Sequence, residues 1–314
     1  MKLFDCFIFY NEIDQLRLRM RYLEDKVDAF LVVEANQTFS GNPKPLFLSS
    51  PNAADLVNHP KLRRFVIDFP EGLDAWGREA YQRDAILQGL KELDASAEDL
   101  ILVSDVDEIP SLSGILRASK ALLADGPNTI TIFEQRLFYF RLNYELVWSR
   151  KLPWLGTVLT RMGTLTAPNK LRMTGRNVRG RKSRGFNQKL KVLHIPDGGW
   201  HFSYLGDDAA LDAKLSAYSH QEHNTPAYRA RSVKTLIDSR QGLHERDGLH
   251  QVWSVIYMEQ IGIDVEIIAS LGLEPLIEPC PDSVRDVIAR LSTHCFETRA
   301  KLGLLAIGVV QKKY

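Results

Sequence analysis

The sequence predicts an α/β fold in which a mostly parallel sheet is flanked by helices. Three observations predict it. Short apolar runs bounded by polar residues recur along the first third of the chain, which is typical of buried strands. Segments with apolar residues at helical spacing separate these runs. Polar and acidic residues directly follow several of the runs, at the edge of a parallel sheet where ligands usually bind.

The first third of the chain is predicted to alternate between strands and helices. The expected strands are Leu3–Tyr10, Ala29–Val33, Phe65–Ile67 and Leu100–Val103. The expected helices are Glu12–Lys26 and Trp76–Leu93. A loop rich in proline and glycine, 40–45, interrupts the pattern after the second strand.

The later part of the chain alternates less regularly. Its expected helices are Ser113–Leu123, Leu211–Ser219, one after Pro226, and Asp282–Leu302. Its expected strands are Thr129–Phe133, Phe138–Leu142, Gly156–Leu159 and Leu190–Ile195. We place a boundary near residue 248, so that residues 1–248 form the α/β domain. Residues 249–314 are then a mainly helical extension packed on or beside it.

Bulk composition is that of a soluble globular protein. The 314 residues include 45% hydrophobic and 25% charged residues, with a formal net charge of +1. This balance gives no reason to expect nucleic acid as a partner. One segment, 170–191, is locally basic and contains no acid. It is interpreted as a solvated loop, as a lid over a diphosphate, or as a cradle for an anionic acceptor.

Cysteine usage and the first residues suggest a compartment. The three cysteines, Cys6, Cys280 and Cys295, show no disulfide or metal-ligand spacing, which favours a reducing environment. We see no signal peptide and no apolar run long enough to span a bilayer. A cytoplasmic location is therefore expected, with a peripheral membrane association left open.

The acidic stretch that follows the strand Leu100–Val103 is the strongest candidate for a site. Asp105, Asp107 and Glu108 lie within four residues, and Pro110 ends the strand pattern. Alternation along an extended chain would place Asp105 and Asp107 on one side. Adjacent carboxylates repel unless a cation lies between them, and hard oxygen ligands suit Mg²⁺ or Mn²⁺. Asp107 is the first choice for the direct ligand, with Asp105 on a ribose or a metal-bound water.

Several motifs in one order resemble a known family. They are Tyr10-Asn11-Glu12, Val33–Thr38 with Ser40-Gly41, Trp76 with Glu79 and Gln82-Arg83-Asp84, Ser104–Pro110, Gly199–Ser203, and Ser219–Glu222. Together they resemble glycosyltransferase family 17 over roughly residues 1–250. With neither a membrane anchor nor a lumenal address, the chain looks like a bacterial, cytoplasmic member whose acceptor need not be a protein glycan.

The resemblance implies a GT-A type fold, a Rossmann-like mixed sheet that binds a nucleotide sugar at an Asp-x-Asp metal site. The implied reaction is an inverting transfer of N-acetylglucosamine from UDP-N-acetylglucosamine, with Mn²⁺ or Mg²⁺ as cofactor. The acceptor is expected to be a saccharide or a lipid-linked saccharide. The residues expected to bind the donor are Asn11, Glu12, Glu34, Asn36, Thr38, Arg83, Asp84, Asp105 and Trp200.

His201 is the third candidate metal ligand, beside Asp105 and Asp107. It follows a pair of glycines that would allow the backbone to approach a ligand closely. The alternative for His201 is a hydrogen-bonded histidine on a half-buried strand. Trp200 beside it either stacks on a sugar or fills the core.

An inverting transfer needs a base that takes the proton of the acceptor hydroxyl. Asp197, Glu134 and Glu145 are candidates by position, and the sequence does not choose among them. His220 and Glu222 are interpreted as a structural hydrogen-bonded pair, with an acceptor role as the alternative.

Two other functions are compatible with the acidic motif. A strand that ends in Asp-x-Asp also resembles the nucleophile motif of haloacid-dehalogenase-like phosphohydrolases, although that motif normally lies near the start of the chain. The remaining alternative is a non-catalytic protein that binds a nucleotide or a glycan on the same scaffold.

Overall fold

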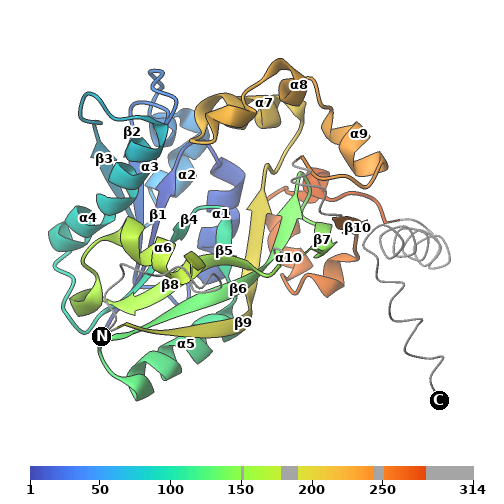
Figure 1. Cartoon of the computed structure of the whole chain (residues 1–314). Helices are drawn as coiled ribbons and strands as arrows, with labels where there is room; N and C mark the ends of the chain where they lie inside the picture. The colour runs from blue at the N-terminus through green and yellow to red at the C-terminus, as the bar shows by residue number, and fades with distance from the viewer. Residues whose placement is uncertain (150–151, 178–189, 244–250, 281–314) are drawn as a thin grey trace, which may run out of the picture.

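Four parallel strands form the first half of the sheet, as the alternating pattern predicts. We describe them in a computed structural model that covers residues 1–149, 152–177, 190–243 and 251–280. The strands are β1 (Leu3–Phe9), β2 (Ala29–Ala35), β3 (Leu62–Ile67) and β4 (Leu100–Asp105). They lie in the order β3-β2-β1-β4, so their carboxyl ends share one edge (Figure 1).

Antiparallel strands extend the sheet beyond β4. They are β8 (Trp154–Arg161), β6 (Thr129–Tyr139), β7 (Tyr144–Trp148) and β10 (Val252–Val255). The long strand β9 (Lys191–Ser203) runs parallel to β6 and pairs with the short strand β5 (Glu108–Pro110) directly after the acidic motif. The predicted α/β class with a mixed sheet is therefore confirmed.

Helices cover both faces of the parallel half, and other helices pack beside the antiparallel strands or lie at one end of the sheet. They are α1 (Ile13–Leu23), α2 (Ala54–Val57), α3 (Ala75–Asp84), α4 (Ile86–Glu92), α5 (Leu112–Asp125), α6 (Pro168–Asn177), α7 (Asp208–Ala217), α8 (Pro226–Arg229), α9 (Val233–Asp238) and α10 (Val265–Ser270). On β1, Phe7 packs with the core of α1, whereas Cys6 packs with the core of α4. Burial on both faces explains the nearly continuous apolar runs.

The structure contains elements that the sequence analysis did not predict, namely α2, α6, α10, β5, β7 and β10, and it divides two predicted segments differently. The single helix expected over Trp76–Leu93 is two helices, α3 and α4, which meet at Ala85. The run Thr129–Phe133 and the first two residues of the run Phe138–Leu142 belong to one strand, β6, because the polar residues between them pair with β9 instead of forming a turn. The remaining three residues, 140–142, lie after the end of β6. The sequence could not exclude a turn between the two runs, since polar residues also favour loops.

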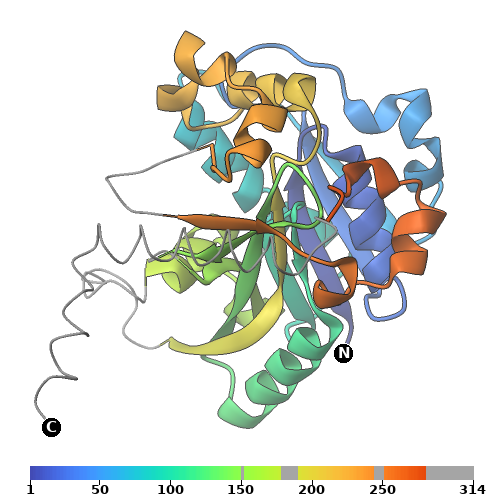
Figure 2. The ribbon, with the colours of Figure 1, turned by 90° about the vertical axis from the view of Figure 1, so that its right-hand side faces the viewer.

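The C-terminal extension begins inside the sheet. Strand β10 lies just after residue 249 and pairs with β7, so the described start of the extension contributes to the same sheet (Figure 2). The helix expected over Asp282–Leu302 lies outside the described residues, and the domain boundary stays a prediction. Within the described ranges, no helix is both long and apolar enough to cross a bilayer.

Candidate active site

A cavity of about 610 Å³ opens at the carboxyl ends of β1, β2 and β4. Side chains from α3, α6, α7 and β9 complete its walls. Both views show α7, α8 and α9, in yellow to orange, gathered at one end of the sheet (Figures 1 and 2). The cavity therefore lies where an α/β sheet usually binds its ligand.

The acidic motif forms the floor of this cavity. Strand β4 ends at Asp105, a two-residue turn follows, and β5 begins at Glu108. Asp105 and Asp107 line the cavity, as alternation predicts, whereas Glu108 is completely buried beneath it. The turn is fixed from below, because Glu108 accepts a hydrogen bond from the Asp105 backbone N–H at 3.1 Å.

Asp107 lies between a lysine and a histidine. The Lys214 Nζ atom is 2.8 Å from Asp107 Oδ2, and the His201 Nε2 atom is 3.4 Å from Asp107 Oδ1. Burial by itself would raise the pKa of Asp107, but Lys214 and His201 outweigh it and hold the pKa well below its usual range. The Asp107 side chain is therefore a stable carboxylate inside the cavity.

Asp105 and Glu108 are neutralised by two buried arginines. Arg83 Nη2 is 2.9 Å from Asp105 Oδ1, and Arg172 Nη2 is 2.6 Å from Asp105 Oδ2. Arg172 also pairs with both oxygens of Glu108. Burial would lower the pKa of Arg172, but the two carboxylates raise it above its usual range. Asp105 thus holds arginines, which does not support its predicted role as a direct metal ligand.

The structure describes only part of the basic segment 170–191, and within that part Arg172 is buried. Arg172 is 1% exposed on α6 and pairs with Asp105 and Glu108 beneath the cavity, so for this residue the interpretation as a solvated loop is wrong. Its guanidinium is removed from water because two carboxylates and a backbone carbonyl receive its N–H groups. Residues 178–189 of the same segment lie outside the described ranges.

The predicted donor residues separate into two groups. Glu12, Thr38, Arg83 and Asp105 line the cavity. Asn11, Glu34, Asn36 and Asp84 lie outside its lining.

Three of the outside group have structural partners. Glu34 is completely buried and pairs with Arg64 at 2.9 Å. Asn36 donates to Asp68, and Asp84 accepts from the Asn169 backbone N–H at 2.8 Å. Carboxylates and amides after a strand therefore do not identify ligand contacts by themselves.

Trp200 lies on the core side of β9, opposite His201. Its indole Nε1 donates to the Ile261 carbonyl at 2.8 Å, and its ring meets Tyr22 edge to face. It does not line the cavity, so this placement contradicts donor binding by Trp200 and supports the core interpretation. Gly199 serves the sheet rather than a ligand, because a Cβ there would lie 2.2 Å from the Ile109 carbonyl oxygen.

None of the three predicted bases reaches the cavity. Asp197 is exposed at a bulge of β9, beside Ser111. Glu134 contacts His194 at 2.9 Å, and Glu145 forms a bidentate pair with Arg136. Their positions contradict a direct role in proton transfer at this cavity, because a base must reach the reacting hydroxyl.

The structure adds residues to the site that the sequence analysis did not select. Lys214, Lys44, Tyr10, Trp76 and His220 all line the cavity. Lys214 gave no signal, because a lysine in an amphipathic helix is usually solvated. Trp76 and His220 lie within the motifs quoted above, but no pattern in the sequence placed them beside each other.

Comparison with known proteins identifies the segment that holds most of this site. A family model described as Glycosyltransferase family 17 matches residues 1–146, from β1 into β7. This chain therefore resembles glycosyltransferase family 17 over residues 1–146. The resemblance stated from the motifs is confirmed over this stretch, which includes both acids of the cavity floor.

Relatives with assigned names match part of the same chain. It is 34% identical over 113 residues to human beta-1,4-mannosyl-glycoprotein 4-beta-N-acetylglucosaminyltransferase and to the rat enzyme of the same name. Each match covers 34% of this chain and 21% of the relative. The chain therefore spans about a fifth of the length of the curated relatives it matches. The predicted enzyme class is that of the matched family and of these relatives.

Solved structures give a weaker likeness. The chain is similar to Francisella tularensis 2-C-methyl-D-erythritol 4-phosphate cytidylyltransferase, with a TM-score of 0.32 and 11% identity over 62% of this chain and 90% of that one. A 4-diphosphocytidyl-2C-methyl-D-erythritol synthase gives a TM-score of 0.35 and 13% identity over 63% and 89%. TM-scores this low carry no functional argument.

Proposed function

We propose that this protein is a metal-dependent, inverting glycosyltransferase that moves N-acetylglucosamine from UDP-N-acetylglucosamine to a saccharide, free or lipid-linked. The observation that carries the proposal is the meeting of Asp105 and Asp107 with Arg83 and Lys214 in one cavity, with both acids and Arg83 inside the segment that the family 17 model matches. The enzyme name of the human and rat relatives supports the choice of N-acetylglucosamine. A cytoplasmic location and a peripheral membrane association remain predictions.

The cations that line the cavity suit a sugar diphosphate. Breaking the bond between the sugar and the β-phosphate places negative charge on the phosphate oxygens, which fixed positive groups stabilise. Arg83 is held by Glu79 and Asp105, so its guanidinium is fixed in place before the donor arrives. Lys214 supplies a second fixed positive charge on the opposite wall, from α7.

Asp107 and His201 fit a divalent cation. Their facing atoms are 3.4 Å apart, a separation compatible with two ligands that each lie about 2.1 Å from one ion. Coordination through Nε2 would place the ring proton on Nδ1, which is buried and has no hydrogen-bond partner among the described residues. Mn²⁺ or Mg²⁺ held by these two residues would supply charge neutralisation at the diphosphate.

The end of the cavity formed by β1 and β2 suits the nucleoside. Tyr10 and Thr38 line the cavity there, and the Thr38 hydroxyl bonds Ser40 and Asn42, which fixes the loop that carries it. Lys44 lies 5.6 Å from the centre of the Tyr10 ring, which orders both side chains. These groups match the stacking and hydrogen-bonding needs of a uracil and its ribose.

The phosphohydrolase alternative finds no support in this geometry. That chemistry requires the first aspartate of the motif to attack a phosphorus atom. Both oxygens of Asp105 instead face arginines at 2.9 and 2.6 Å, which lowers their nucleophilicity.

A thermal melt with UDP, with and without Mn²⁺, tests the proposal. A ligand at about a hundred times its dissociation constant stabilises a protein by roughly 2.7 kcal/mol, enough to raise the melting temperature by several degrees. We expect a rise that needs both UDP and Mn²⁺, followed by UDP release when UDP-N-acetylglucosamine is the donor. Absence of any rise with UDP, CDP or GDP would contradict a nucleotide-sugar site. If UDP raises the melting temperature equally with and without Mn²⁺, only the proposed metal dependence would be contradicted.

A further inference from the structure

Among the described residues, four carboxylates line the cavity, and each already has a partner. Asp105 and Asp107 pair with arginines and Lys214, as described above. Glu79 pairs with Arg83 at 2.8 Å and accepts a hydrogen bond from Ser219. Glu12 accepts hydrogen bonds from two backbone N–H groups at 3.0 and 3.1 Å. Each of these carboxylates therefore already has a cationic or N–H/O–H partner, and the predicted bases lie outside the cavity.

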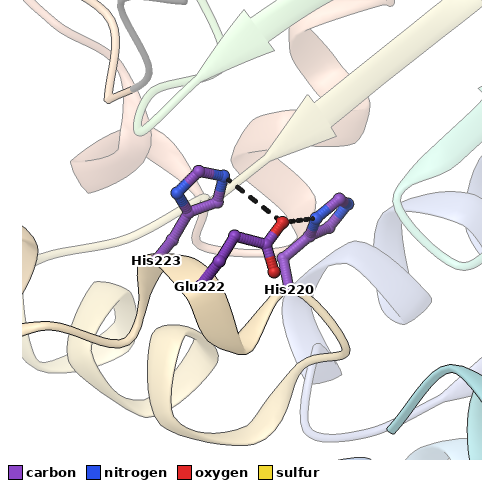
Figure 3. A group of neighbouring side chains, drawn as sticks. All are labelled: His220, Glu222 and His223. Carbon is purple, nitrogen blue, oxygen red and sulfur yellow. Dashed lines mark hydrogen bonds and ion pairs between the residues drawn. The ribbon is translucent and has the colours of Figure 1, made fainter.

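His220 is a cavity-lining group of a different kind. Its Nδ1 atom is 2.6 Å from Glu222 Oε1, a contact drawn in Figure 3. Such a carboxylate fixes the proton of a neutral imidazole on Nδ1 and leaves Nε2 able to accept a proton. In Figure 3 the second ring nitrogen of His220 lies on the side of the ring turned away from Glu222.

The surroundings of His220 suit a sugar hydroxyl. The Trp76 ring meets the His220 ring at 4.5 Å, nearly at right angles, and Trp76 is 48% exposed. An exposed tryptophan in a cavity wall offers an apolar face to a sugar ring. The adjacent Ser219 contacts Glu79, which holds Arg83, so this wall is directly connected to the acidic floor.

We propose that His220 is the general base of the transfer, with Glu222 as its positioning residue and Trp76 as the platform for the acceptor sugar. This inference rests on the proposed function. The acceptor oxygen forms a bond to the anomeric carbon of the donor while the bond from that carbon to the β-phosphate oxygen breaks. The diphosphate leaves with the electron pair, and His220 Nε2 takes the proton of the hydroxyl. Glu222 stabilises the imidazolium until solvent removes the proton.

His223 provides a matched control for this proposal. It belongs to the same turn, and its Nε2 atom is 3.8 Å from the same Glu222 oxygen, but it is not part of the cavity lining (Figure 3). A metal ion bound by His220, Glu222 and His223 would need all three residues. A proton-transfer pair needs only His220 and Glu222.

The first measurement is UDP release from UDP-N-acetylglucosamine with water as the acceptor. H220A and H220N should lower the rate by about 10²–10⁴-fold, while the rise in melting temperature with UDP and Mn²⁺ stays as in wild type. H223A should stay within about threefold of wild type. E222Q should give an intermediate loss, because the ring keeps a hydrogen-bond partner but loses the negative charge.

A second measurement does not depend on turnover. Nitrogen-15 NMR of the histidine rings should show neutral His220 with its proton on Nδ1, and E222Q should reduce the population of this tautomer. A neutral His220 ring with its proton on Nε2 would overturn the proposal. If wild type binds UDP but releases none from the donor, the NMR measurement alone tests the base assignment.

The remaining outcomes separate the two proposals. If wild type shows no UDP-dependent rise in melting temperature, the proposed function fails and the base assignment falls with it. If the rise is present but H220A and H220N release UDP within threefold of wild type, only the base assignment is overturned. Equal losses in H220A and H223A, together with loss of stabilisation by Mn²⁺ or Zn²⁺ alone, would make the cluster a metal site and also overturn it.

Discussion

Lys214 and Asp107 form an ion pair of 2.8 Å that joins helix α7 to the turn after strand β4. The two residues are 107 positions apart in the chain. The pair is largely removed from water, and it fixes the wall that carries Lys214 against the acidic floor. Because a partly buried ion pair is sensitive to the loss of either partner, it offers a direct test of the geometry.

Lys214→Met should destabilise the protein and weaken UDP binding. Removal of one partner leaves the other charge uncompensated, which typically costs about 3–5 kcal/mol. Urea unfolding at neutral pH measures this loss. Lys234→Met is the matched control, because Lys234 pairs with Asp238 on the exposed surface and its removal should leave the midpoint unchanged. Equal effects of the two substitutions would contradict a structural role for the pair.

The contribution of Asp107 to the free energy of unfolding should depend on pH. Its pKa is held below that of an unfolded aspartate, about 3.9, so the folded state gains stability above that pH and loses it as the pH falls. The free energy of unfolding of wild type should therefore exceed that of Asp107→Asn by a constant amount between about pH 5 and 8, and the difference should shrink toward pH 3. Urea titrations across this range test the sign. A difference that grows in acid would contradict the assignment.

Arg172→Met should also destabilise the chain, by about 3–5 kcal/mol, because Glu108 would remain charged in a fully buried position. The double variant Arg172→Met with Glu108→Met should recover part of this loss, since it removes both charges. Arg229→Met serves as the surface control, from an exposed pair with Asp212. If the double variant lost as much unfolding free energy as the two single variants lose together, or more, the two side chains would not be acting as a pair.

His201→Ala should remove the manganese dependence of UDP binding while leaving most of the stability. His201 faces Asp107 across 3.4 Å and packs against the Trp154 ring at 4.5 Å, but its other ring nitrogen has no hydrogen-bond partner among the described residues, so no hydrogen bond is lost at that nitrogen. Melts with UDP and increasing Mn²⁺ compare this variant with His194→Ala, which changes a histidine of the same strand outside the cavity. A manganese response that persists in His201→Ala would exclude this residue as a ligand.

The sequence predicted the fold better than the site, for a physical reason. Apolar runs such as Leu100–Val103 depend on local burial, and this run lies in the strand expected of it. Asp105 and Asp107 were also found, because an acidic cluster after a buried strand is a local signal. Ion pairs are different: Arg172 and Lys214 reach the acids from residues 67 and 107 positions away. No spacing along the chain marks such partners.

The wrong assignments have the same origin. Asp197 was selected because it lies four residues before His201 in the sequence. In the structure a bulge of β9 separates them, and the Asp197 backbone carbonyl accepts a hydrogen bond from Ser111 at the start of α5 while the residue is exposed. Trp200 and His201 are adjacent, yet alternate side chains of a strand point to opposite faces, so only one of them can reach the cavity. Proximity in the chain was therefore a poor guide to proximity in space.

The number of residues in the β9 bulge, between Ile195 and Gly199, determines which face of the sheet the following side chains occupy. Phe133 pairs with Ile195 and Gln135 pairs with Gly199, so β9 uses three residues where β6 uses one. Adding or removing one residue between Ile195 and Gly199 would shift every later side chain to the opposite face, moving the indole into the cavity and the imidazole into the core. A change of two residues would restore both. Tolerance to insertion here should therefore alternate between odd and even lengths.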